Sequence, residues 1–276
     1  MTVTGGRVES SVLPSAMEYL AYLPPAADDH AQHPVIFLLH GRGDSAEAWR
    51  DAFDLFDGLI RADVVQPFLA VAPDAPWSSR GGYWADSAFE GSDVHEPGSA
   101  IATAFVRELV PHVDAELPTM PRREGRALCG YSMGGAGALT LALAHQELFS
   151  AAIALSPAVY DPLPPRDSTA RSRGAFGVGS SLFDERRYLE QGYPAALSAV
   201  RRDSPVHLFL GVGADEEPSG DPEARAPQAE IARLADRAAG TPGITSHLEV
   251  VPGAHDWATW SRLLEAALPA VLPRLG

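Results

Sequence analysis

The chain has 276 residues, of which 46% are hydrophobic and 21% are charged, and this composition excludes disordered and fibrous architectures. The formal charge of -15 excludes nucleic acids and anionic membranes as partners, because phosphate groups are bound by basic surfaces. The single cysteine, Cys129, excludes an internal disulfide and a thiolate cluster for a metal ion.

Membrane and export signals are not apparent in the sequence. It contains no run of about 18 apolar residues. Residues 1–20 lack the basic start and the continuous apolar stretch of a signal peptide. We therefore expect a cytoplasmic protein without a membrane partner, whose oligomeric state the sequence leaves open.

Strands and helices are predicted to alternate along the chain. Uninterrupted apolar runs, typical of strands buried on both faces of a sheet, occupy residues 35–39, 68–72, 127–129, 152–155, 206–212 and 247–251. Apolar residues at three-to-four spacing predict helices over residues 48–61, 100–117, 134–145, 226–239 and 257–272. Residues 17–22 are compatible with an antiparallel edge strand. The alternation predicts a single α/β domain, residues 1–276, with a doubly wound, mostly parallel sheet and helices on both faces.

One segment, residues 160–205, interrupts this alternation. It begins with the prolines of residues 161–165 and continues with a stretch rich in Gly, Ser and Arg. We expect a small loop-rich insertion, which is equally compatible with a lid and with an inert surface excursion.

The motif Gly-Tyr-Ser-Met-Gly-Gly at residues 130–135 follows a predicted strand and precedes an Ala- and Leu-rich helix. This is the context of a nucleophile elbow, in which a serine lies on a strained strand-to-helix turn. Small residues two before and two after it let the backbone pass close to its neighbours. Ser132 is therefore the candidate nucleophile.

A serine nucleophile requires a histidine base and a carboxylate, in the chain order Ser, Asp or Glu, His. His255 follows the strand predicted at 247–251, and Asp215 follows the strand predicted at 206–212. We expect His255 to be the base and Asp215 to orient it. Glu216 and Glu217 compete with Asp215 for this role. Asp256 is disfavoured because it is adjacent to the base in sequence.

The turn at residues 40–43, His-Gly-Arg-Gly, follows the strand that commonly leads to an oxyanion loop. The backbone N–H groups of Arg42 and Met133 are the candidate oxyanion donors. The Arg42 side chain could instead bind an anionic substrate group, with Asp44 and Asp86 as its alternative ion-pair partners.

Aromatic residues cluster after the predicted strand ends and beside the histidine, where they could line a substrate pocket or fill the core. These aromatics are Trp77, Tyr83, Trp84, Trp257 and Trp260. The substrate-binding candidates are Gly41, Trp84, Tyr131 and Trp257.

Together these motifs resemble one branch of the α/β-hydrolases, the esterase group that includes esterase D, S-formylglutathione hydrolase, ferric-enterobactin esterases and mycobacterial mycolyltransferases. The resemblance rests on residues 40–44, 83–86, 130–135, 155–157, 213–215 and 255–260. It implies the α/β-hydrolase fold, a triad of Ser132, Asp215 and His255, and an oxyanion hole at Arg42 and Met133. The His-x-Trp-x-x-Trp spacing resembles the mycolyltransferases, which use a glutamate where this chain offers Asp215.

The expected activity is that of a serine esterase, which hydrolyses a small-molecule carboxylic ester through an acyl-enzyme and needs no metal or organic cofactor. Two alternatives share the acyl-enzyme: an acyltransferase that uses an acceptor alcohol, and a thioesterase. A non-catalytic binding protein is disfavoured by the complete set of triad residues.

Overall fold

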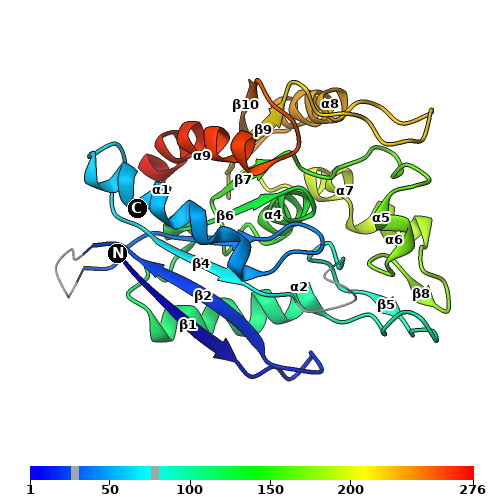
Figure 1. The fold of residues 1–276 in the computed structure, drawn as a ribbon, viewed down its shortest axis with the longest axis horizontal. Helices are drawn as coiled ribbons and strands as arrows, with labels where there is room; N and C mark the ends of the chain where they lie inside the picture. The colour runs from blue at the N-terminus through cyan, green and yellow to red at the C-terminus, as the bar shows by residue number, and fades with distance from the viewer. Residues whose placement is uncertain (26–30, 76–80) are drawn as a thin grey trace.

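The computed structural model describes residues 1–25, 31–75 and 81–276. A sheet with the strand order β1-β2-β4-β3-β6-β7-β9-β10 runs through the molecule (Figure 1). Its strands are β1 (Thr2–Val8), β2 (Met17–Leu23), β3 (Val35–Leu39), β4 (Leu69–Pro73), β6 (Arg126–Tyr131), β7 (Ala151–Leu155), β9 (Val206–Gly213) and β10 (Ile244–Val251). β1 and β2 pair antiparallel, as do β2 and β4, whereas the other neighbours are parallel.

Helices cover both faces of this sheet, as expected (Figure 1). One face packs against α4 (Met133–Ala144), α8 (Pro227–Ala239) and a helical run made of α2 (Ile101–Ala104), a π-helical turn (Phe105–Leu109) and α3 (Val110–Glu116). The opposite face packs against α1 (Arg50–Arg61), the 3-10 turn Ala46–Trp49 before it, and α9 (Trp257–Val271). The central strands are buried along their whole length because both faces are covered.

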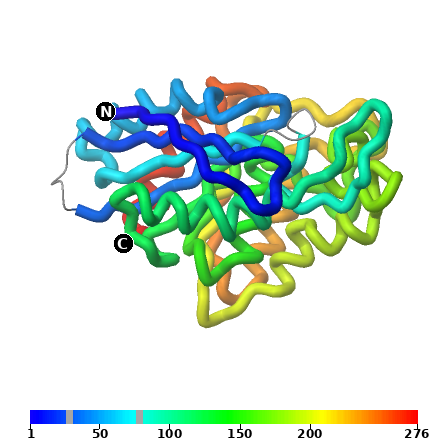
Figure 2. Tube along the Cα trace, turned by 90° about the horizontal axis from the view of Figure 1, so that it is seen from below, coloured from blue at the N-terminus to red at the C-terminus, as the bar shows by residue number. Residues whose placement is uncertain are grey.

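The N-terminal hairpin of β1 and β2 forms one edge of the sheet and lies in front when the molecule is seen from below (Figure 2). The sequence pattern predicted part of β2 but not β1. At the opposite edge, β10 begins three residues before the predicted strand.

The segment 160–205 contains short elements rather than loop alone. These are α5 (Thr169–Ser172), β8 (Val178–Gly179), α6 (Glu185–Gln191) and α7 (Tyr193–Ser198). β8 pairs with β5 (Ala88–Phe89), so two segments far apart in sequence lie side by side at one end of the molecule (Figure 2).

Within the ranges that the structure describes, no helix has the length and apolar character needed to cross a membrane.

Candidate active site

Ser132 lies between the end of β6 and the start of α4, in a backbone conformation with φ 54° and ψ -119°. A positive φ is strained for a residue with a side chain and costs on the order of 1–3 kcal/mol. The surrounding backbone holds it: the Ser132 N–H donates to the Leu155 carbonyl at 2.8 Å, and the Ser132 carbonyl accepts from Ala158 N–H at 2.9 Å. The turn therefore has the geometry expected of a nucleophile elbow.

Glycine is required on either side of Ser132 because the backbone segments pass so closely. A Cβ atom at Gly130 would lie 2.2 Å from the Gly134 carbonyl oxygen, and one at Gly134 would lie 2.0 Å from the Leu39 carbonyl oxygen. Neither distance is compatible with a side chain, and the neighbours are backbone atoms that cannot move aside. Glycines at these positions allow the start of α4 to pack against the ends of β3 and β6.

Three side chains from separate parts of the chain form a continuous hydrogen-bonded series at the carboxyl ends of β6, β9 and β10. The Ser132 Oγ lies 2.9 Å from His255 Nε2, and His255 Nδ1 lies 2.7 Å from Glu216 Oε2. The Ser132 hydroxyl and the Glu216 carboxylate thus lie at opposite ends of one imidazole. This is the arrangement in which a histidine removes a proton from a serine while a carboxylate stabilises the imidazolium.

The carboxylate in this series is Glu216, whereas the sequence predicted Asp215. Asp215 is exposed, and its carboxylate accepts from the Gly253 N–H at 3.0 Å, while its own N–H donates to the Gly253 carbonyl at 2.9 Å. It therefore ties the loop after β9 to the loop after β10, while the carboxylate bonded to the imidazole is that of Glu216. The glutamate has one more methylene group, and it reaches back from the next position to His255.

The other two competing carboxylates have separate positions. Asp256 caps the N-terminus of α9, where its Oδ1 accepts from Thr259 N–H at 2.9 Å. Glu217 is exposed.

Glu216 is buried and accepts three hydrogen bonds. Its Oε1 accepts from the Ser156 hydroxyl at 2.5 Å and from the Gly213 N–H at 2.9 Å, and its Oε2 faces His255. Burial alone would raise the pKa of this carboxyl, but the hydrogen bonds from His255, Ser156 and Gly213 outweigh it and hold the pKa below its ordinary value. These hydrogen bonds therefore favour the ionised form of Glu216 despite its burial.

The loop after β3 is fixed by the buried side chain of His40. The Ala75 N–H donates to His40 Nε2 at 3.1 Å, so the ring proton is on Nδ1 and is directed to the Gly41 carbonyl at 2.8 Å. Because the peptide unit between Gly41 and Arg42 is planar and trans, anchoring its carbonyl directs the Arg42 N–H the opposite way. His40 thus orients the backbone group that the sequence identified as an oxyanion donor.

The second expected donor, the Met133 N–H, belongs to the first turn of α4, where N–H groups have no partner within the helix. Neither this N–H nor that of Arg42 has a hydrogen-bond partner among the described residues. No described residue therefore competes with a ligand for either group.

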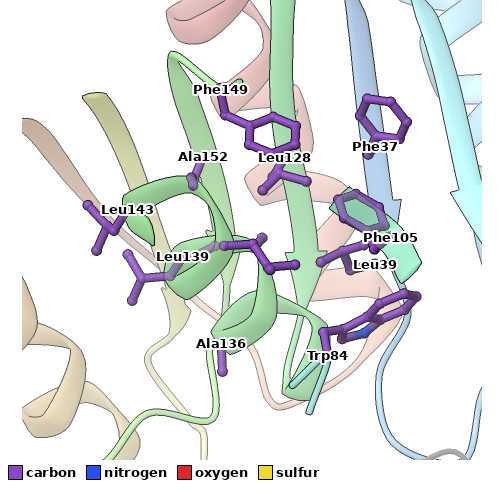
Figure 3. Packing of buried hydrophobic residues seen from close by; sticks show 14 of the residues in the cluster. Phe37, Leu39, Trp84, Phe105, Leu128, Ala136, Leu139, Leu143, Phe149 and Ala152 are labelled. Atoms are coloured by element: carbon purple, nitrogen blue, oxygen red, sulfur yellow. The ribbon is translucent and has the colours of Figure 1, made fainter. Parts of the chain in front are cut away.

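Three of the four predicted substrate-binding residues lie beneath the site and not on its surface. Trp84 is 1% exposed, and its indole packs into the core beside Leu39 and Phe105 (Figure 3). Tyr131 is also 1% exposed. Gly41 is buried so closely under Tyr131 that a Cβ would lie 2.5 Å from its ring.

The other aromatic candidates divide between the core and the surface. Trp257 is partly exposed and stays a candidate for the pocket. Trp260 is 6% exposed and Tyr83 is buried, with its hydroxyl 3.3 Å from Thr169 Oγ1. Trp77 lies outside the described residues.

The exposed side chain of Arg42 has neither of its suggested partners. Asp44 accepts a hydrogen bond from the Tyr131 hydroxyl at 2.7 Å, and Asp86 accepts from the backbone and hydroxyl of Thr103. The bonding partners of these two carboxylates are therefore Tyr131 and Thr103, not the Arg42 guanidinium.

Solved structures share this architecture over nearly the whole chain. A ferulic acid esterase matches 99% of the chain and 98% of its own length with a TM-score of 0.78 at 22% identity. An S-formylglutathione hydrolase from Agrobacterium tumefaciens matches 99% and 95% with a TM-score of 0.72 at 17% identity. The fold is therefore the α/β-hydrolase fold.

Comparison of the sequence with known families and proteins also finds esterases. The model of a family described as "Putative esterase" matches residues 10–271. Esterase Rv1288 of Mycobacterium tuberculosis is 32% identical over 124 residues, which are 44% of this chain and 24% of that protein. The matched segment thus spans about a quarter of the length of this curated relative.

Proposed function

Because the chain belongs to this esterase family, we propose that it hydrolyses small-molecule carboxylic esters through an acyl-enzyme formed on Ser132. The observation that carries the proposal is the series from Ser132 Oγ through His255 to Glu216, positioned at an elbow with a positive φ. We also propose that residues 1–276 form one domain, since strands from residue 2 to residue 251 belong to one sheet.

In the first half of the reaction, His255 Nε2 takes the Ser132 proton and Oγ bonds to the ester carbonyl carbon. The carbonyl oxygen becomes an oxyanion, which accepts from the N–H groups of Arg42 and Met133. Glu216 keeps the other imidazole proton on Nδ1 and stabilises the imidazolium. The carbon–oxygen bond to the alcohol then breaks, and His255 returns the proton to the leaving alcohol, which leaves an acyl-enzyme.

In the second half, water takes the place of the alcohol. His255 removes one water proton while the oxygen attacks the acyl carbon, and the same two amides stabilise the oxyanion. Collapse of this intermediate breaks the bond to Ser132 Oγ, which recovers its proton from His255. The products are the free acid and the original enzyme, and no step requires a metal ion or an organic cofactor.

The direct test is Ser132→Ala, measured by hydrolysis of p-nitrophenyl acetate and by labelling with a fluorophosphonate. We expect both to be lost, because the nucleophile is removed while the alanine retains the fold; circular dichroism checks the fold. Ser150→Ala is the matched control, since Ser150 lies at the opposite end of β7 and its hydroxyl makes only a 3.4 Å contact with the Arg126 carbonyl. Hydrolysis retained by Ser132→Ala would refute the proposal.

The acyl and alcohol preferences can be tested with esters suggested by the structural neighbours. Methyl ferulate and methyl acetate differ only in the acyl group, methyl acetate and p-nitrophenyl acetate differ only in the leaving group, and S-formylglutathione introduces a thioester. A high kcat/KM confined to one of them identifies the side of the ester that the protein recognises.

A further inference from the structure

Ser156, which no step of the proposed reaction uses, lies directly beneath the candidate triad. It follows β7, is 2% exposed and has a φ of 43°, which is strained for a residue with a side chain. Its N–H is bonded to the Gly211 carbonyl at 2.7 Å, so neighbouring backbone maintains this conformation. Strained residues of this kind concentrate at functional sites.

The direction of the hydrogen bonds around Ser156 follows from the chemistry of its two partners. The Trp260 indole N–H is 3.0 Å from Ser156 Oγ, and because an indole nitrogen can only donate, the serine oxygen must accept. The serine has a single hydroxyl proton, and Glu216 Oε1 lies 2.5 Å away. Since a carboxylate can only accept, that proton is directed to Glu216. The series therefore runs in one direction, from Trp260 to Ser156 to Glu216.

Trp260 also contacts His255. The contacts among Trp260, Ser156, Glu216 and His255 therefore form a closed ring. Its ring lies edge-on to the His255 imidazole, with centroids 5.2 Å apart and an interplanar angle of 86°. Its opposite contact is with Tyr131, which is stacked on it at 4.4 Å and immediately precedes Ser132. One buried tryptophan thus contacts the imidazole through its ring and is connected to the carboxylate through the Ser156 hydroxyl, to which its N–H donates.

We propose that Ser156 and Trp260 are positioning residues that hold the Glu216 carboxylate in the orientation that presents Oε2 to His255. Of the two donors to Oε1, the Gly213 N–H belongs to the last residue of β9, three positions before Glu216 in the same segment, whereas Ser156 directly follows the neighbouring strand β7. Ser156 therefore ties the carboxylate to the end of a second strand, in addition to the strand that leads to Glu216 itself. The inference rests on the proposed function, because positioning has kinetic meaning only if His255 acts as a base.

The test compares Ser156→Gly, Ser156→Ala and Trp260→Phe with the wild type and with Ser150→Ala. Glycine adopts a φ of 43° without strain, so Ser156→Gly removes the hydroxyl and relieves the backbone at the same position. We expect both Ser156 variants to lower kcat for p-nitrophenyl acetate by about 10- to 100-fold at unchanged KM, the cost of a misplaced catalytic group. Trp260→Phe keeps an aromatic ring beside His255 and leaves the serine proton free to reach Glu216, so we expect a loss of about 2- to 10-fold.

A second readout is independent of turnover. The proton shared by His255 Nδ1 and Glu216 Oε2 gives a downfield resonance in the proton NMR spectrum, which we expect to weaken or move in Ser156→Gly and Ser156→Ala and to persist in Trp260→Phe and Ser150→Ala. Thermal unfolding of each variant separates these changes from loss of fold.

Two outcomes would overturn the inference: a wild-type kcat in Ser156→Gly, or an unchanged resonance in both Ser156 variants. A wild type that hydrolyses none of the esters would instead refute the proposed function, and the NMR readout would still decide whether Ser156 positions the carboxylate.

Discussion

Two separate substitutions of a carboxylate by its amide, Glu216→Gln and Asp215→Asn, distinguish the residue that the structure pairs with His255 from the one that the sequence predicted. Three donors face the Glu216 carboxylate, from His255, Ser156 and the Gly213 N–H. A glutamine offers one oxygen and one NH₂ group, so at least one donor loses its acceptor. If the oxygen serves the two donors at Oε1, the NH₂ group faces His255 Nδ1. The imidazole must then carry its proton on Nε2, where it cannot accept the Ser132 proton.

A wrong tautomer of this kind lowers kcat by about 10⁴-fold. At about 1.36 kcal/mol for each factor of ten, this corresponds to a rise of about 5.4 kcal/mol in the activation free energy. In Asp215→Asn, by contrast, the amide oxygen can still accept from the Gly253 N–H, so we expect a kcat close to that of the wild type. The assay is steady-state hydrolysis of p-nitrophenyl acetate at pH 8, with thermal unfolding as a check on the fold. A larger loss in Asp215→Asn than in Glu216→Gln would show that the assignment of Glu216 is wrong.

Two further predictions concern the scaffold. Gly134→Ala places a Cβ 2.0 Å from the Leu39 carbonyl oxygen, so we expect a loss of at least about 3 kcal/mol in the free energy of unfolding, measured in urea. Gly58→Ala in α1 has no atom within 4 Å of the new Cβ and should gain about 0.5–1 kcal/mol; equal effects at the two positions would contradict this reasoning. Burial, Arg274 and His247 lower the pKa of His207 from 6.5 to about 4. As the pH falls from 6.5 to 4, the unfolded chain therefore binds a proton at His207 that the folded chain does not yet bind, and the free energy of unfolding decreases. His207→Gln should flatten the pH dependence of urea unfolding in that window, and an unchanged slope would exclude His207 as its source.

The elements that the sequence predicts well are those whose burial is set by the sheet itself. β3, β4, β6, β7 and β9 lie in its interior, and a strand covered on both faces needs an uninterrupted apolar run. β1 is an edge strand with two glycines, and its residues are exposed or only partly buried, so its sequence carries no such run. What makes it a strand is its pairing with β2, a contact that local sequence does not encode.

The short helices of the 160–205 insertion also depend on contacts that local sequence does not encode. Its helices have four to seven residues, fewer than the two turns over which an apolar period becomes recognisable. Contacts with a distant part of the chain hold them in place: Arg187 donates to the Asp86 carbonyl, and Thr169 Oγ1 lies beside the Tyr83 hydroxyl. These contacts join positions about a hundred residues apart, so the motif positions near residue 83 gave no indication of them.

Aromatic residues near the site were expected either to line a pocket or to fill the core, and the direction of each side chain decides between the two. Trp84 has a φ of 55° and points into the core, where its indole N–H donates to the His40 carbonyl at 3.2 Å. A sequence position at the end of a strand identifies the neighbourhood of a residue but not which side of the backbone its side chain occupies. The backbone of Trp84 has a positive φ, which the sequence does not indicate, and its side chain points into the core and not toward a pocket.

The carboxylate that the structure places at His255 is one residue away from the one that the sequence predicted, and the difference has a geometric cause. Ser132 and His255 occur in motifs whose glycines and spacing specify a local conformation, whereas Asp215 was chosen because it follows a strand. After β9 the chain turns, and successive side chains point in different directions, so Asp215 faces Gly253 while Glu216 points inward. The resemblance to the mycolyltransferases contained the relevant signal, since those enzymes use a glutamate. A buried carboxylate that must reach an imidazole from the far side of a turn favours the longer side chain, and this reach distinguishes Glu216 from its neighbour.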